Sequence, residues 1–282
     1  MTKPLLPMLI AVVAFGMTAA SAAEPGRAKS FVYKSTPQGE LSLKVYLPPE
    51  WNRDQQRPAI VFFFGGGFKK GTVQQFEPHS EYLARRGMVA VCADYRVKSR
   101  HHVAPDACVE DAKSAIRWVR RHAGELGVDP ERIVGSGGSA GGNLAACAGM
   151  CPGLDADNED HSVSSRPNAL VLFNPLLRFD ERRTVERLEG DAERGRAISP
   201  TQHLRADSPP TLILFGTGDK LLRQGKDFMD RSSELAHRAE LFLADGVGHG
   251  FFNRSPWRER TLARVDEFLV SLGYLDEPSP AL

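Results

Sequence analysis

The strongest constraint on this chain is a series of short apolar runs, each followed by a stretch with helical patterning. Continuous apolar runs are typical of strands that are buried on both faces of a sheet. Strands that alternate with helices favour a mainly parallel sheet with helices on both faces. We therefore predict an α/β fold. The predicted strands of this series are residues 58–64, 88–96, 132–137, 168–175, 210–219 and 239–245.

Two more strands are expected before this series. "KSFVYKS" and "LSLKVYLP" alternate or nearly alternate apolar and polar residues, with "TPQGE" between them, which predicts a β-hairpin and brings the sheet to eight strands. The clearest helix is residues 107–127, where apolar side chains share one face. Its charged side chains, including Lys113 and Arg117, are expected to be directed mostly away from that face. Further helices are predicted at residues 76–87, 140–150, 223–238 and 256–273.

The size and charge of the chain limit its functional classes. With 282 residues, 41% of them hydrophobic, it suits one large domain with a substantial core. A formal net charge of +1 gives no electrostatic case for binding nucleic acid or an anionic membrane surface. Residues 178–209 are rich in Arg, Glu and Asp and poor in apolar residues, so we interpret them as an excursion and a candidate small lid.

The N-terminus has the features of an export signal. Lys3 precedes an apolar run from Leu5 to Phe15, and small residues follow, with candidate cleavage sites at residues 20–22 and 21–23. The run is shorter than a membrane span requires. An uncleaved anchor is the alternative, although no cysteine lies here to take a lipid. We predict a signal peptide at residues 1–23, a mature domain at residues 24–282, secretion or export to the periplasm, and no stable membrane insertion after cleavage.

The cysteines give no sign of a metal site. An exported protein can hold disulfides, and the four thiols leave three full pairings open. There is no C-x-x-C and no histidine spacing typical of zinc, so we predict no structural metal, and we predict no cofactor. The four residues are Cys92, Cys108, Cys147 and Cys151.

A serine lies among glycines where a predicted strand ends and a helix begins. Residues 137–141, "GGSAG", are the only match to G-x-S-x-G in the chain. Small neighbours are needed if Ser139 sits at a sharp strand-to-helix turn, and the following helix N-terminus favours negative charge. A phosphate-binding loop is disfavoured because no lysine follows these glycines. We predict that Ser139 is a nucleophile.

A second glycine cluster follows the first central strand. Gly65, Gly66 and Gly67 in "VFFFGGGFKKG" would let the backbone approach a bound acyl group closely. Backbone N–H groups fixed where an oxyanion forms often make the largest single contribution to catalysis. We assign this oxyanion-hole role to the amides of Gly66 and Gly67, with Ala140 as the third donor. A plain flexible turn is the alternative.

Three motifs of the chain resemble those of a known family. "FGGGF" (64–68), "DYR" (94–96) and "GGSAGGNLA" (137–145) match, in order, the motifs of the α/β-hydrolase esterases and lipases of the hormone-sensitive-lipase-like type, and the resemblance covers roughly residues 40 to 272. It implies the α/β-hydrolase fold and ester hydrolysis. Phe64 stands where the family usually has His, so the bonding that steadies the oxyanion loop must differ. Gly138 stands where Asp commonly precedes the serine.

The family's order of catalytic residues is serine, acid, histidine. Asp219 comes just past a predicted strand in "LILFGTGDKLL", and His249 follows the next strand in "ADGVGHGFFN". We predict that His249 is the base and that Asp219 orients it. Asp245 is the alternative acid. Among the other histidines, we expect His79, His122 and His237 at the surface and His101 and His102 in a solvated loop.

The resemblance implies acyl transfer to water through an acyl-serine. With only the 178–209 excursion as a lid, the cap should be minimal and the site open. We predict a serine carboxylesterase for short acyl groups, such as acetyl or feruloyl esters on polysaccharide. "GGGFKKG" and "SPPTLILFGTGDKL" are also similar to carbohydrate acetyl and feruloyl esterases. The alternatives are a serine peptidase or arylformamidase on the same fold, or a non-catalytic binding protein that retains it. A monomer or homodimer is expected.

Overall fold

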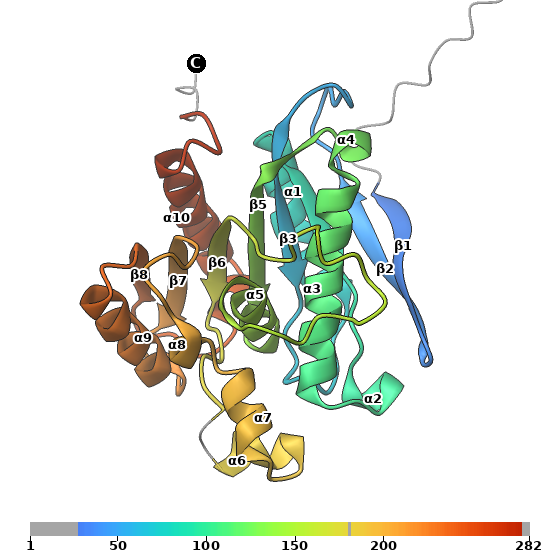
Figure 1. The fold of residues 1–282 in the computed structure, drawn as a ribbon. Coiled ribbons are helices and arrows are strands. Elements are labelled where there is room, and N and C mark those ends of the chain that lie inside the picture. The colour runs from blue at the N-terminus through green and yellow to red at the C-terminus, as the bar shows by residue number, and fades with distance from the viewer. Residues whose placement is uncertain (1–27, 180–181, 278–282) are drawn as a thin grey trace, which may run out of the picture.

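The structure is a computed structural model that describes residues 28–179 and 182–277, so the predicted signal peptide lies outside the described residues. Eight strands form one sheet in the order β1-β2-β4-β3-β5-β6-β7-β8 (Figure 1). The strands are β1 (Lys29–Thr36), β2 (Gly39–Tyr46), β3 (Arg57–Phe63), β4 (Val89–Ala93), β5 (Val128–Gly138), β6 (Ala169–Phe173), β7 (Thr211–Gly216) and β8 (Ala239–Ala244).

The strand directions agree with the predicted pattern. The opening strands β1 and β2 pair antiparallel as a hairpin, and β2 pairs antiparallel with β4. All further neighbours, from β4 across to β8, are parallel. The carboxyl ends of parallel strands meet at one edge of the sheet, so the loops that follow β3, β5, β7 and β8 gather there.

Helices cover both faces of the sheet (Figure 1). They are α1 (Glu77–Arg85), α2 (Lys98–His101), α3 (Pro105–Arg121), α4 (Ala123–Leu126), α5 (Ala140–Met150), α6 (Arg182–Val185), α7 (Ala192–Ala197), α8 (Pro200–His203), α9 (Leu222–Glu234) and α10 (Trp257–Ser271), with short 3-10 turns η1 (Val73–Phe76), η2 (Glu186–Leu188) and η3 (Phe251–Asn253). The α/β-hydrolase fold predicted from the resemblance is confirmed.

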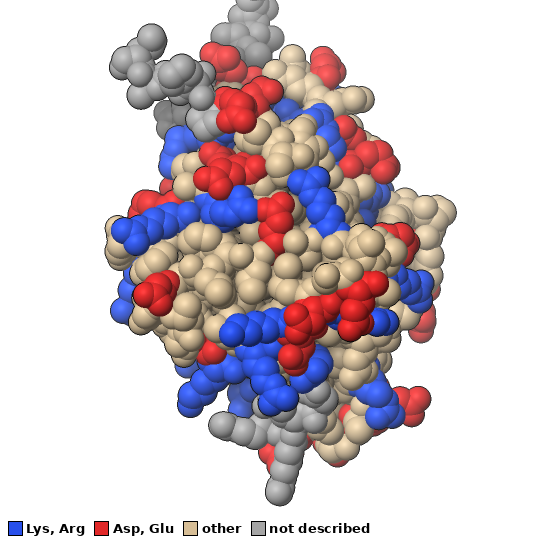
Figure 2. Space-filling view, turned by 90° about the vertical axis from the view of Figure 1, so that its left-hand side faces the viewer, with Lys and Arg blue, Asp and Glu red and all other residues tan. Residues whose placement is uncertain are grey.

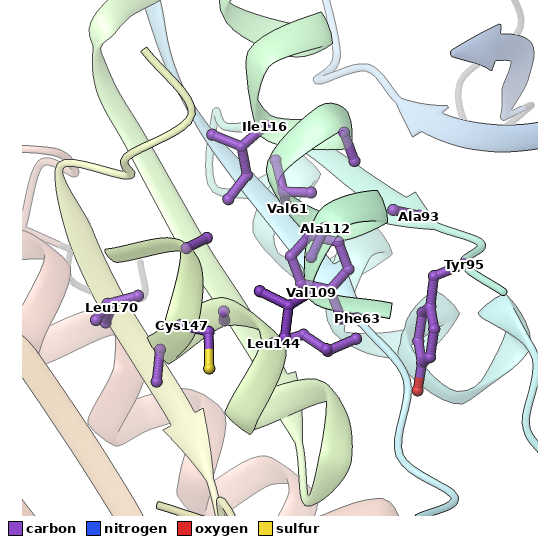
Figure 3. Packing of buried hydrophobic residues seen from close by; sticks show 14 of the residues in the cluster. Val61, Phe63, Ala93, Tyr95, Val109, Ala112, Ile116, Leu144, Cys147 and Leu170 are labelled. Carbon is purple, nitrogen blue, oxygen red and sulfur yellow. The ribbon is translucent and has the colours of Figure 1, made fainter. Parts of the chain in front are cut away.

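Alternate residues of the central strands supply the two halves of the core. Val61 and Phe63 of β3 pack with Val109 of α3 and Leu144 of α5 on one face (Figure 3). Ile60 and Phe62 belong to the cluster on the other face, which α1 and α10 cover. Burial on both faces explains why these strands are continuous apolar runs rather than alternating ones. The sheet is thus a rigid platform for the loops at its carboxyl edge.

Lys113 and Arg117 lie outside the apolar face of α3, as the periodicity predicts, but they are not exposed to solvent. These residues are only 3% and 4% exposed. The loop after α5 crosses over them: Lys113 Nζ donates to the Cys151 carbonyl (3.0 Å), and Arg117 Nε donates to that of Val163 (2.8 Å). Asp155 provides a carboxylate for both side chains. Helical periodicity identifies the face toward the sheet, but not a loop that covers the opposite side.

The predicted excursion contributes α6, η2, α7 and α8, which lie beyond the carboxyl edge of the sheet (Figure 1). It is anchored by buried Leu188 and Ile198, and Arg194 of α7 pairs with Asp106 of α3 at 2.6 Å. Its role as a lid stays a prediction. Figure 2 shows basic and acidic side chains together on one face, with Lys and Arg gathered toward the end where this excursion lies.

Three further features concern the described residues only. The four cysteines are buried and free of disulfides. No group of three or more His, Cys, Asp or Glu side chains is arranged so that it could hold a metal ion within residues 28–179 and 182–277. None of the helices in the same ranges combines the length and apolar character needed to cross a membrane.

Candidate active site

The turn between β5 and α5 forces Ser139 into an unusual backbone conformation. Its φ of 54° and ψ of −112° lie outside the regions that residues with side chains normally adopt, which is typical of a strained functional turn. The glycines around it allow a close approach of the chain. A Cβ atom at Gly141 would lie 2.0 Å from the Phe63 carbonyl oxygen, and one at Gly137 would lie 2.5 Å from Gly141. The need for small neighbours is therefore met as predicted.

The predicted acid and base meet at this turn. His249 Nε2 lies 2.9 Å from Ser139 Oγ, and His249 Nδ1 lies 2.7 Å from Asp219 Oδ2. An ionised carboxylate only accepts hydrogen bonds, so Nδ1 donates to Asp219 and Nε2 is left to accept from the serine hydroxyl. The Asp219 side chain is 1% exposed, whereas that of His249 is 43% exposed. This arrangement can remove a proton from Ser139 at a site open to solvent.

The alternative acid lies elsewhere. Asp245 accepts a hydrogen bond from Thr217 at 3.2 Å, and His249 bonds to Asp219 instead. Of the eight histidines, all of which lie in the described ranges, His249 is the one that contacts Ser139. His101 accepts a hydrogen bond from the Val97 amide, and burial lowers its pKa.

Two of the histidines expected at the surface are buried, so that prediction is wrong. His237 is 6% exposed and bonds to the Pro209 carbonyl. His79 is 1% exposed, and neither of its ring nitrogens has a hydrogen-bond partner within the described ranges. Burial lowers the pKa of His79 to about 3, so the ring is neutral at physiological pH. Its aromatic neighbours are Phe62, Phe76, Phe173 and Phe252.

The predicted oxyanion donors lie in a tight loop beside the serine. Gly66 has a φ of 129°, and a Cβ there would lie 1.8 Å from the Lys70 carbonyl oxygen, so only glycine fits. A Cβ built at the preceding Gly65 would lie 3.5 Å from that of Ser139. Within the described part of the chain, the amides of Gly66, Gly67 and Ala140 have no hydrogen-bond acceptor. They are available to a ligand oxygen.

The start of this loop is steadied by aromatic packing. The Phe64 ring stacks on Tyr95 with centroids 4.1 Å apart, and the Tyr95 hydroxyl donates to the Phe64 carbonyl at 2.7 Å. Both side chains are buried. A Cβ at Gly71 would lie 2.4 Å from the Phe64 ring, so the loop closes tightly over that ring. These contacts steady the oxyanion loop by packing and by a backbone hydrogen bond, as expected from the presence of Phe64 where the family usually has histidine.

Sequence reasoning missed three side-chain amides at the site. Gln75 accepts a hydrogen bond from the Gly65 amide at 2.6 Å and donates to Asn253 at 3.1 Å. Asn174 accepts from the Gly250 amide at 3.0 Å, and its Nδ2 lies 3.4 Å from His249 Nε2. Asn174 directly follows β6 at the carboxyl edge, which is a signal that could have identified it. Gln75 and Asn253 lie in short turns without any recognisable pattern.

Comparisons with known proteins agree with this geometry. The BD-FAE family model matches residues 43–173. Esterase 2 of Thermogutta terrifontis, in its structure phosphorylated by paraoxon, is 47% identical, with coverage of 90% of this chain and 98% of that chain and a TM-score of 0.85. Carboxylic ester hydrolase LipN of Mycobacterium tuberculosis is 37% identical over 261 residues, which are 84% of this chain and 67% of LipN.

More distant relatives are longer than this chain. The probable carboxylic ester hydrolase LipM of the same bacterium is 27% identical over 265 residues, with coverage of 85% of this chain and 61% of LipM. The chain spans about half to three-fifths of the length of several curated relatives that it matches. The match to esterase 2, by contrast, extends over nearly all of that protein. The chain belongs to the hormone-sensitive-lipase-like esterases of the α/β-hydrolase fold.

Proposed function

We propose that the protein is a serine carboxylesterase that hydrolyses short-chain acyl esters through an acyl-Ser139 intermediate. One observation carries the proposal: Ser139, His249 and Asp219 form a continuous hydrogen-bonded series at a solvent-open position. Membership of the esterase family supports it. The presence of nucleophile, base and acid in one hydrogen-bonded series favours this proposal over a non-catalytic binding protein.

Acylation begins when Ser139 Oγ attacks the ester carbonyl carbon and His249 Nε2 takes the serine proton. Asp219 stabilises the imidazolium that forms. The carbonyl oxygen gains the electron pair of the broken π bond and accepts hydrogen bonds from Gly66, Gly67 and Ala140. When the tetrahedral intermediate collapses, the carbon–oxygen bond to the alcohol breaks, and the imidazolium proton passes to the leaving oxygen.

Deacylation repeats these steps with water. His249 Nε2 removes a proton from a water molecule, whose oxygen attacks the acyl carbon of Ser139. Collapse of the second intermediate returns the proton to Ser139 Oγ and releases the carboxylic acid. The choice of short acyl groups is supported by one similar protein: structures of Thermogutta terrifontis esterase 2 carry bound propionate and bound butyrate.

We further propose that the natural substrates are acetyl or feruloyl esters on polysaccharide and that the protein is secreted or periplasmic. The His249 side chain is 43% exposed, which leaves room for a bulky alcohol such as a sugar chain. The candidate export signal in residues 1–23 is in keeping with an extracellular polymer as substrate.

A substrate screen separates the two levels of the proposal. The purified mature protein should hydrolyse p-nitrophenyl acetate and butyrate faster than the octanoate. It should also release acetate from acetylated xylan or ferulate from feruloylated arabinoxylan. The Ser139→Ala variant is the control for each substrate. Hydrolysis of the p-nitrophenyl esters without release from any glycan would remove the carbohydrate part. No hydrolysis of any ester would remove the esterase itself.

A further inference from the structure

A bridge of side-chain amides connects the oxyanion loop to the loop that carries His249. Gln75 Oε1 accepts from the Gly65 amide at 2.6 Å, and Gln75 Nε2 donates to Asn253 Oδ1 at 3.1 Å. Asn253 Nδ2 then donates to the carbonyl of Gly250 at 2.9 Å, and Gly250 directly follows His249. Gln75 and Asn253 are 178 residues apart in the sequence. Two loops from distant strands are thus joined through two side chains.

The hydrogen bonds at its ends give this bridge one orientation. The Gly65 N–H can only donate, and the Gly250 carbonyl can only accept. The Gln75 amide must therefore present its oxygen to Gly65 and its nitrogen to Asn253, and Asn253 must present its nitrogen to Gly250. A carboxamide accepts at one atom and donates at the other, which a carboxylate cannot do. The bridge therefore requires a carboxamide at residue 75, in addition to a side chain of this length.

The bridge continues toward the catalytic base. The Gly250 amide donates to Asn174 Oδ1, which directs Asn174 Nδ2 toward His249 Nε2 at 3.4 Å. The stack of Phe64 on Tyr95 holds the residue that directly precedes Gly65. Gln75 and Asn253 therefore link the two halves of the site by hydrogen bonds, beside the stack of Phe76 on Phe252.

We propose that Gln75 is a positioning residue for ester hydrolysis, which keeps the Gly66 and Gly67 donors in register with His249. The donors must meet the oxyanion while His249 handles the serine proton, so both loops must be placed correctly at the same moment. A misplacement of about 1 Å at a catalytic centre can cost roughly 100-fold in rate. The inference rests on the proposed esterase activity and is independent of the natural substrate.

The first test is the Gln75→Ala variant with p-nitrophenyl acetate as substrate. We expect kcat to fall by about 10- to 30-fold while KM changes by less than about 2-fold, because the bridge acts on the transition state rather than on binding. Gln74→Ala is the matched control, since Gln74 is an exposed neighbour in the same turn η1. Its kcat should equal that of the wild type.

The second test separates the bridge from a local packing role. Gln75→Glu keeps the contact to Gly65 but cannot donate to Asn253, so it should lower kcat as Asn253→Ala does. In the Gln75→Ala/Asn253→Ala double variant, kcat should fall no further than in the more impaired single variant, because both changes cut one connection. Independent roles would give losses that multiply. Melting temperatures show whether each variant is folded.

The outcomes distinguish this inference from the proposed function. A wild-type protein without esterase activity overturns the proposed function. An active wild type with unchanged kcat in Gln75→Ala, or with multiplicative losses in the double variant, overturns the bridge. If Gln75→Ala does not fold, Gln75→Glu and Asn253→Ala decide the question: reduced kcat in both supports the bridge, and wild-type kcat in either overturns it.

Discussion

The Phe252 ring occupies the space that a side chain on residue 138 would need. A Cβ built at Gly138 would lie 2.7 Å from Phe252 Cζ and 3.4 Å from Phe76 Cζ. Phe252 is 1% exposed and belongs to the aromatic cluster around His79. The packing of Phe252 therefore leaves no room for the Asp that the family resemblance would lead one to expect at residue 138.

Gly138→Asp should therefore lower both stability and activity. The new side chain must displace the buried Phe252 ring next to the residue that precedes Ser139, and such overpacking costs about 1–3 kcal/mol. Urea unfolding and kcat with p-nitrophenyl acetate measure the two effects. Phe252→Leu in the same chain should restore part of the stability. Gly124→Asp is the control, because nothing lies within 4 Å of a Cβ at Gly124; an equal loss in both variants would contradict the packing argument.

Asp219→Asn should reduce kcat by about 10³- to 10⁴-fold with little change in KM. The amide can no longer fix the His249 tautomer that accepts the serine proton, nor stabilise the imidazolium. The matched variant Asp245→Asn should retain activity close to that of the wild type, since Asp245 bonds to Thr217 and not to His249. Comparable losses in the two variants would show that Asp219 has no special role.

The sequence predicted most of the fold because its signals are local. Continuous apolar runs identify buried strands, and each of the six predicted in the parallel series corresponds to a strand of the sheet. The small residues around Ser139 could also be interpreted from the sequence, because the close approach of Gly141 to Phe63 leaves no room for a side chain. Asp219 and His249 were placed by motif order, and the hydrogen bonds between these distant loops are seen only in the folded chain.

Features that depend on distant contacts could not be predicted. His79 lies in a helix and has polar neighbours in sequence, but four phenylalanine rings surround it. One of them, Phe76, directly precedes the same helix, and the other three come from β3, β6 and η3. Lys113 and Arg117 are covered by a loop whose path has no periodic signal. The hydrogen bond between the side chains of Gln75 and Asn253 forms only when folding brings their two turns together.

Buried His79 should make the protein less stable in acid. Its folded-state pKa of about 3 lies below the ordinary value of 6.5, so the unfolded chain binds a proton that the folded chain does not. This contribution is fully present above pH 6.5 and is lost progressively as the pH falls toward 3. The free energy of unfolding should therefore be lower at pH 4.5 than at pH 7 by roughly 2–3 kcal/mol from this residue alone.

The His79→Phe variant isolates this effect. The phenyl ring is also aromatic and can pack among the surrounding phenylalanines, but it does not titrate. Urea unfolding of both proteins at pH 7 and at pH 4.5 should show a smaller loss for the variant. His102→Ala, at an exposed position, should follow the wild type. Parallel curves for the wild type and His79→Phe would exclude His79 as a source of acid sensitivity.

Covalent labelling of Ser139 tests its role as the nucleophile most directly. Thermogutta terrifontis esterase 2, which this chain resembles closely, has been captured phosphorylated by paraoxon. Incubation with paraoxon should abolish hydrolysis of p-nitrophenyl acetate and add one diethylphosphoryl group to the peptide that contains Ser139, whereas Ser139→Ala should be neither labelled nor active. A fully inhibited protein labelled at another residue, or a Ser139→Ala variant with wild-type activity, would show that Ser139 is not the nucleophile.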